Sequence, residues 1–202
     1  MTVIFIIQIV AFFLCLSVHE AAHAWAAFRL GDPSAKAEGR MTLNPLAHID
    51  IYGTVIVPLV LAMSHAPIFG WAKPVMINPR NFKNPNRDSF LTALAGPISN
   101  FVFAILLSII ARFFSYNSTF YAVLYLLIQI NVTLGVFNLL PIPPLDGSKI
   151  WYLILPEESA YTLEKYGPLI LIAVLIFSST GNNNFLFSTI SIISDYLIGI
   201  IS

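Results

Sequence analysis

The chain has 202 residues, of which 57% are hydrophobic and only 10% are charged. A soluble domain carries about 25% charged residues, so this composition excludes an ordinary soluble protein and indicates an integral membrane protein. Acidic and basic residues balance at ten each, which argues against a nucleic-acid partner. The only cysteine, Cys15, excludes an internal disulfide and a cysteine-rich zinc site.

The apolar runs predict an all-α polytopic membrane protein with about five to six transmembrane or re-entrant helices and a short membrane-associated extended segment. The expected spans and apolar regions are 3–29, 51–70, 89–111, 119–140 and 166–201. The second of these contains glycine and proline, so it either spans the bilayer or re-enters it where protein covers the backbone. The last is interrupted at 181–184 and predicts two short helices or a hairpin.

The first span carries the pattern H-E-x-x-H at residues 19–23. Because four residues make about one helical turn, His19 and His23 lie on one face and both imidazoles can reach one metal ion. Glu20 lies close enough to act as a general base on a water at that metal without being a ligand. Ionisable groups inside a membrane helix are expensive and indicate function. The structural alternative is a buried Glu–His pair that joins two helices.

A proline-rich loop offers a third ligand, which a catalytic zinc site requires. Three prolines between residues 141 and 144 break the helix that precedes them and hold Asp146 in an irregular loop. This position favours Asp146 as the third ligand. The other candidates are Cys15, His48, Asp50, His65 and Asp195.

The distribution of Lys and Arg predicts the orientation in the membrane. No basic residue precedes the first span, whereas three follow it between residues 29 and 40. The first helix is therefore expected to run from the outside to the cytoplasm. The span 119–140 then returns Asp146 to the cytoplasmic side, at the depth of the two histidines. Arg112 is the one charge that disagrees with this arrangement.

These motifs, in this order, resemble the site-2 protease family of intramembrane zinc metalloproteases. The matching elements are H-E-A-A-H at 19–23, L-N-P at 43–45, G-W-A-K-P at 70–74, A-G-P-I-S-N at 95–100 and N-L-L-P-I-P-P-L-D-G at 138–147. The resemblance extends over most of residues 1–150. It points to the compact bacterial or archaeal branch, without a PDZ or CBS domain.

The resemblance implies a role for each matching site residue. His19, His23 and Asp146 are expected to bind one Zn²⁺ ion per chain, with Glu20 as the general base. Asn138 is expected to help bind substrate or stabilise the oxyanion, since an amide can donate to a carbonyl oxygen that gains charge in a dry site. The alternative for Asn138 is a hydrogen bond between helices, and we expect such a bond for Asn100.

A second implication concerns the segment that follows residue 70. Its prolines at 74 and 79 favour an extended chain over a helix. By resemblance, residues 70–74 belong to an extended element that pairs with the substrate backbone. Because proline cannot donate, the pairing is expected to use the N–H groups of Val75, Met76 and Ile77. Trp71 is expected at the same substrate site, although it could instead be an interfacial belt residue. Met76 departs from the family pattern, which has a second proline there.

The implied function is an intramembrane endopeptidase that cleaves a transmembrane protein substrate from the cytoplasmic side of a bacterial or archaeal membrane. We expect one domain over 1–202, with a catalytic core over about 1–155 and C-terminal apolar helices over about 166–201, in the lipid bilayer and with a homo-oligomer possible. The main alternative is a metal or proton transporter that uses the same cluster. A second is a non-catalytic relative, which the intact Glu20 argues against.

Overall fold

The structure is a computed structural model that describes residues 2–57, 60, 63, 73–179 and 184–201. Within these residues the chain is helical and forms no strand, which confirms the predicted all-α polytopic fold. Four helices are long and apolar enough to cross a membrane, and α8 is a shorter apolar helix. The long elements are α1 (Thr2–Leu30), α4 (Pro85–Ala111), α5 (Thr119–Asn138), α7 (Glu157–Ser179) and α8 (Phe185–Ile201).

Short elements connect the long helices. They are α2 (Ser34–Ala37), the 3-10 helix η1 (Pro45–His48), the π-helix η2 (Ile51–Ile56), the 3-10 helices η3 (Pro79–Asn81) and η4 (Asp146–Ile150), and α6 (Trp151–Ile154). Asparagine and proline begin η1 and η3: the side chain of Asn44 or Asn78 accepts a backbone N–H, and proline follows as the first residue of the turn. This arrangement suits the first turn of a helix because proline lacks a donor there.

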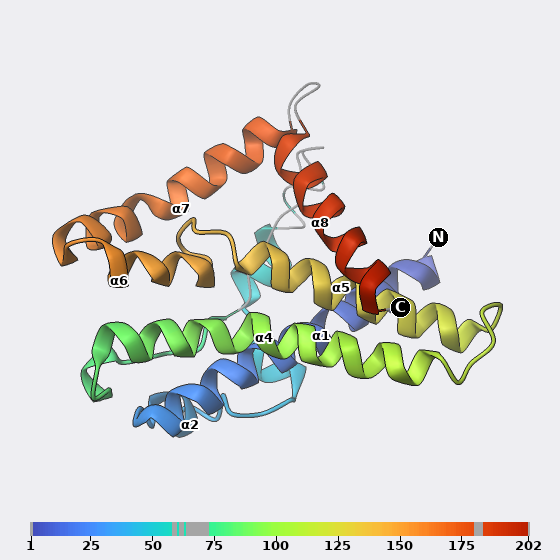
Figure 1. Ribbon diagram of the computed structural model, residues 1–202, viewed down its shortest axis with the longest axis horizontal. Coiled ribbons are helices and arrows are strands. Elements are labelled where there is room, and N and C mark those ends of the chain that lie inside the picture. The colour runs from blue at the N-terminus through green and yellow to red at the C-terminus, as the bar shows by residue number, and fades with distance from the viewer. Residues whose placement is uncertain (1, 58–59, 61–62, 64–72, 180–183, 202) are drawn as a thin grey trace.

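Helix α4 lies at the centre of the bundle, where it packs against both α1 and α5 (Figure 1). Helix α5 also packs against α8. Small residues on α4 let the helices approach closely, and branched residues on α5 and α8 fill the space between them. The buried core of this three-helix contact includes Ala104, Leu107, Ile128, Val132 and Ile190.

Two helix boundaries differ from the sequence prediction. Helix α4 begins at Pro85 rather than near residue 89, and α7 begins at Glu157 rather than near residue 166. The charged residues at both starts look like loop in a hydropathy pattern. They are nevertheless compatible with a first turn, since α7 places two acidic residues there and acidic groups favour a helix N-terminus.

The loop after α1 is tied to the chain that leads into α4. Gly31 follows the last residue of α1, and its φ of +113° suits glycine. The buried carboxylate of Asp32 accepts hydrogen bonds from the backbone N–H and hydroxyl of Ser34, from the side-chain amide of Asn81 and from the backbone N–H of Asn78. One side chain therefore fixes where residues 78–81 lie against the end of α1.

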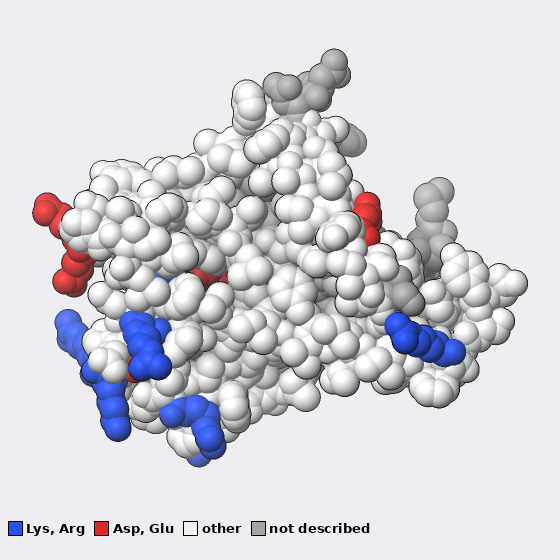
Figure 2. Space-filling model, in the orientation of Figure 1, with Lys and Arg blue, Asp and Glu red and all other residues white. Residues whose placement is uncertain are grey.

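Part of the predicted substrate segment lies outside the described residues. Trp71 is such a residue. Most of the separate apolar run 51–70 also lies outside them, so whether that run spans or re-enters the membrane stays a prediction. Residues 73–78 form neither helix nor strand. Most of the ten Lys and Arg residues of the chain lie between residues 29 and 87, and Figure 2 shows basic side chains gathered at the end of the molecule where α2 and the start of α4 lie.

Candidate metal centre

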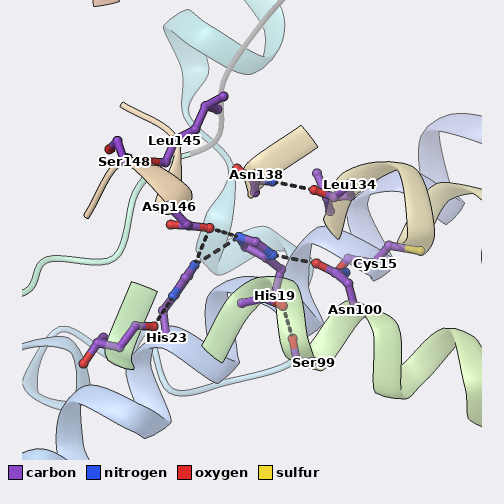
Figure 3. A network of polar contacts seen from close by, with 12 residues as sticks. Cys15, His19, His23, Ser99, Asn100, Leu134, Asn138, Leu145, Asp146 and Ser148 are labelled. Carbon is purple, nitrogen blue, oxygen red and sulfur yellow. Dashed lines mark hydrogen bonds and ion pairs between the residues drawn. The ribbon is translucent and has the colours of Figure 1, made fainter. Parts of the chain in front are cut away.

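Three side chains from distant parts of the sequence converge between α1, α4 and η4. His19 Nε2 lies 3.1 Å from Asp146 Oδ2, and His23 Nε2 lies 3.3 Å from the same oxygen. The two Nε2 atoms are 3.0 Å apart. Both histidines are buried, whereas the side chain of Asp146 is 20% exposed. Figure 3 shows the two imidazoles turned toward Asp146. Water or a substrate would therefore reach the cluster from the side of Asp146.

Hydrogen bonds behind each imidazole determine which ring nitrogen faces the cluster. His23 Nδ1 lies 2.8 Å from the backbone carbonyl oxygen of Thr92. A carbonyl oxygen only accepts, so His23 Nδ1 carries the proton, and in the neutral ring Nε2 is left as an acceptor. His19 Nδ1 lies 2.6 Å from Asn100 Oδ1, on the opposite side of the ring from the cluster. In its neutral form, each ring therefore directs an unprotonated Nε2 at Asp146.

The three converging atoms fit a metal ion. Two neutral Nε2 atoms and a carboxylate oxygen are all acceptors, and Asp146 Oδ2 is buried without a hydrogen-bond partner among the described residues. A cation between them would satisfy all three. Ligands of a tetrahedral zinc ion at about 2.0–2.2 Å lie about 3.3–3.5 Å apart, close to the observed spacings of 3.0–3.3 Å. The residues present thus fit a zinc ion held by three protein ligands.

Close packing of two glycines places these residues. A methyl group at Gly96 of α4 would overlap His23 Nε2 and come within 2.6 Å of His19 Cε1, so only a glycine lets α4 lie against the imidazoles. A methyl group at Gly147 would overlap the carbonyl oxygen of Leu139 at the end of α5. The turn that carries Asp146 therefore rests directly on that helix end.

The predicted catalytic residues adjoin this cluster. Glu20 is partly exposed on α1, and no hydrogen bond or ion pair engages its carboxylate within the described part of the chain. Asn138 lies on the last turn of α5, near Asp146 in the view of Figure 3. Its side-chain amide donates to the carbonyl of Leu134 at 2.9 Å in its own helix, and within the described residues it forms no bond to another helix. The amide carries a second N–H, which can donate to a ligand.

The remaining candidates that the structure describes do not join the cluster. Among the described residues, the only group of His, Cys, Asp and Glu with metal-ligand spacing is His19, His23 and Asp146. Cys15, Asp50 and Asp195 lie elsewhere, and His65 is outside the described residues. His48 is buried and directs Nε2 at the carbonyl of Thr42, 3.0 Å away, in the loop before η1.

Sequence reasoning missed part of what Asn100 does. The expected bond from Asn100 to a neighbouring helix is confirmed, since its Nδ2 donates to Asn131 on α5 at 2.8 Å. The same side chain also contacts a candidate metal ligand, His19. The signal was the A-G-P-I-S-N pattern, but a pattern cannot show which helix faces an asparagine.

Residues 73–78 are fixed at both ends and open between them. The backbone N–H of Lys73 donates to the carbonyl of His48 at 3.0 Å, and the N–H of Asn78 donates to Asp32 at 2.7 Å. Val75 is buried against Ala24 and Ala35. Between the two anchors, no backbone hydrogen bond is formed within the described residues.

The fold and the cluster define a class: a multi-pass helical membrane protein with a buried candidate metal centre. The sequence model of peptidase family M50 matches residues 114–179 of this chain. YwhC of Bacillus subtilis, whose name describes a zinc metalloprotease, is 33% identical over 183 residues, which cover 83% of this chain and 79% of YwhC. No solved structure matches this chain.

Two further relatives are also named as zinc metalloproteases. Rip2 of Mycolicibacterium smegmatis, also named for a zinc metalloprotease, is 32% identical over 86% of this chain and 68% of its own length. Zinc metalloprotease MJ0392 of Methanocaldococcus jannaschii is 38% identical over 79 residues, which cover 39% of this chain and 23% of that protein. The chain belongs to peptidase family M50, the site-2 protease family, and is a membrane-embedded zinc metalloprotease. Its bacterial and archaeal relatives are consistent with the predicted origin.

Proposed function

We propose that this protease cleaves peptide bonds in or near the transmembrane segments of other membrane proteins, with its active site toward the cytoplasmic side. The observation that carries the proposal is the position of the cluster along α1. His19 and His23 lie eleven and seven residues before Leu30, the last residue of the helix. At 1.5 Å per residue they lie about 10–17 Å inside a membrane-spanning helix. A bond that reaches them is within the bilayer or close to its surface.

In this proposal His19, His23 and Asp146 hold one zinc ion per chain. The bound metal would polarise a peptide carbonyl and lower the pKa of a water molecule. Glu20 accepts the proton of the attacking water and passes it to the leaving amine. Its free carboxylate, next to the buried histidines, suits that transfer. The second N–H of Asn138 donates to the carbonyl oxygen that gains charge.

The open stretch between Lys73 and Asn78 is proposed to hold the substrate. A transmembrane helix hides its carbonyl groups in its own hydrogen bonds, so cleavage requires local unwinding, and unpaired backbone groups are costly in hydrocarbon. The backbone groups of Val75, Met76 and Ile77, which bond to no other backbone group among the described residues, can pair with an unwound strand, which is β-strand addition. Trp71 is proposed to flank the same strand.

The proposed orientation of the protein in the membrane rests on where its Lys and Arg residues lie. Most Lys and Arg residues lie at the end of the molecule formed by α2, η3 and the start of α4, and basic loops favour the cytoplasm. Helix α1 ends there, so the histidines and Asp146 lie in the cytoplasmic half. The expected partners are the lipid bilayer and a transmembrane substrate, and a homo-oligomer is compatible with them.

The test separates metal binding from chemistry. Wild type, Glu20→Gln, Asp146→Ala and Cys15→Ala would be purified in nanodiscs and analysed for zinc by mass spectrometry. Cleavage would be measured on fluorescent single-span model peptides, with and without a central Asn-Pro pair. Glu20→Gln should keep one zinc per chain and lose about 10²–10⁴-fold in rate, because it removes only the base.

The other variants identify the ligands. Asp146→Ala should lose most of its zinc, since it removes one of three protein ligands, whereas Cys15→Ala should keep both zinc and cleavage. Glu20→Gln that cleaves at the wild-type rate would contradict the proposed base. Zinc flux into liposomes without any cleavage by wild type would favour the transporter instead.

A further inference from the structure

Behind His19 a chain of buried amides crosses three helices. Asn100 on α4 and Asn131 on α5 are both completely buried. Asn131 Oδ1 accepts from Asn100 Nδ2 at 2.8 Å, and Asn100 Oδ1 lies 2.6 Å from His19 Nδ1. Figure 3 shows Asn100 beside His19 on the face away from Asp146. Buried polar groups inside a membrane bundle are costly, so a fully bonded chain of them requires an explanation.

Bonds to backbone carbonyls determine how each side-chain amide in this hydrogen-bonded series is oriented. Asn131 Nδ2 lies 2.8 Å from the carbonyl oxygen of Leu127, which can only accept, so the amino group of Asn131 is on that side. Its Oδ1 must then face Asn100, whose amino group donates to it and to the carbonyl of Cys15 at 3.4 Å. Asn100 therefore presents its oxygen to His19. Only the tautomer with a proton on Nδ1 fits that oxygen.

The two histidines thus obtain their tautomers in different ways. His23 Nδ1 meets a backbone carbonyl, that of Thr92, and no side chain is needed. His19 meets a side-chain amide, which could turn over and present its amino group instead. If it did, the proton of His19 would move to Nε2, the atom that faces the cluster. The bond to Asn131, together with the longer one to the Cys15 carbonyl, opposes that rotation.

We infer that Asn131 is a positioning residue for the metal centre. Although it does not contact the cluster, it fixes the orientation of the Asn100 amide and so keeps His19 Nε2 free for the metal. This inference rests on the proposed metal site. Replacing a residue that hydrogen-bonds to a metal ligand typically weakens metal affinity by about 10–100-fold. Asn131 acts on His19 through one further hydrogen bond, the one to Asn100.

The first measurement needs no metal. The chain contains four histidines, so imidazole ¹⁵N resonances of metal-free protein in nanodiscs can be assigned with single His variants. In wild type, His19 should keep a proton on Nδ1, hydrogen-bonded to Asn100. In Asn131→Leu a fraction of the His19 rings should lose the Nδ1 proton, because the amide of Asn100 can then rotate. His23 should remain in its wild-type tautomer in both proteins.

The second measurement is zinc affinity at fixed pH, by competition with a chromophoric chelator. Asn131→Leu should bind zinc about tenfold more weakly, at the lower end of the range for such residues. Asn131→Asp should lie close to wild type. A protonated carboxyl there donates to Leu127 and accepts from Asn100, which restores the direction of the chain.

A matched control separates this effect from simple loss of a buried bond. Ser108 is a buried residue of α4 whose hydroxyl donates to the carbonyl of Ile201 in α8. Ser108→Ala should lower thermal stability yet leave zinc affinity and the His19 tautomer unchanged. An Asn131→Leu protein with wild-type affinity and a single wild-type tautomer would overturn the inference. Wild type that binds no zinc, but shows the expected tautomer shift in Asn131→Leu, would instead overturn the proposed metal site.

Discussion

Gly96 lies directly against the imidazole of His23, with no room between them for a methyl group. We therefore expect Gly96→Ala to displace both candidate ligand rings. Alanine normally stabilises a helix relative to glycine by about 0.5–1 kcal/mol, yet here zinc affinity should fall by at least about 100-fold, beyond the usual effect of a residue outside the ligand shell. Zinc titration of the purified variant measures this change.

Gly199 provides the control for this substitution. It also lies in an apolar helix, α8, but a methyl group there would meet nothing within 4 Å among the described residues beyond its own helix backbone and chain neighbours. Gly199→Ala should therefore keep wild-type zinc affinity and cleavage. If Gly96→Ala bound zinc as tightly as Gly199→Ala does, the packing of α4 on the histidines would not control the site.

The orientation can be tested with single cysteines at Ser34, Asn84 and Asn117 in a Cys15→Ala background. Ser34 lies at the same end of the bundle as Asn81, to which its hydroxyl is bonded at 3.5 Å. Asn117 lies beyond the far end of α4, whose 27 residues span about 40 Å. A membrane-impermeant maleimide should label Ser34 and Asn84 from the cytoplasm and Asn117 from outside. Labelling of Asn84 from outside would reverse the proposed orientation.

Much of the cluster could be predicted from sequence because it follows from local rules. Helical spacing joins His19 to His23, and the proline-rich loop singles out Asp146. The role of Asn131 could not be predicted in this way, since its only signal is a polar residue within an apolar helix. Its partners come from two other helices, so their relation depends on packing and not on periodicity.

The same limit applies to loops. Asp32 looks like part of a helix stop signal, together with Gly31 and Pro33, and nothing in its neighbourhood indicates a bond to Asn78. The structure shows that it joins the end of α1 to the chain before α4. Such contacts between segments more than forty residues apart depend on how the helices are arranged, which hydropathy does not describe.

Asp32 is therefore expected to control the position of residues 73–78. Asp32→Ala removes the acceptor for Ser34, Asn78 and Asn81. Hydrogen bonds to a charged group contribute about 1.5–3 kcal/mol each to stability. Without them, the end of residues 73–78 at Asn78 should become mobile. We expect KM for a model peptide to rise about tenfold with zinc content unchanged. Asp195→Asn, a change on the exposed side of α8, is the control and should leave KM unaltered.

The hydrogen bonds that Asp32 accepts from Ser34, Asn78 and Asn81 should also weaken in acid. Burial alone raises the pKa of Asp32, but the hydrogen bonds from Ser34, Asn81 and Asn78 outweigh it and hold the pKa below its usual value. A lowered pKa in the folded state means that the ionised carboxylate stabilises the fold at neutral pH. This contribution is lost as the pH falls through the folded pKa. The difference in thermal stability between wild type and Asp32→Asn should therefore shrink only below about pH 4. A difference that persists unchanged at pH 3 would contradict the assignment.

The last prediction concerns how substrate is held. If residues 73–78 pair with an unwound substrate, the pairing uses backbone N–H groups that proline lacks. Val75→Pro or Ile77→Pro should lower cleavage of a helical model peptide by about tenfold, since one or two backbone hydrogen bonds at about 1 kcal/mol each are lost along with local shape. Zinc content should stay at the wild-type value.

Two controls make this test specific. Met76 is exposed, and Met76→Ala keeps its N–H, so that variant should retain most of the cleavage rate. A peptide with an Asn-Pro pair near the cut site is already unwound, so it depends less on pairing and should partly restore the rate of both proline variants. If the proline variants cleave a fully helical peptide as fast as wild type does, residues 73–78 do not pair with substrate. Their anchors at Lys73 and Asn78 would then serve only to connect the helices.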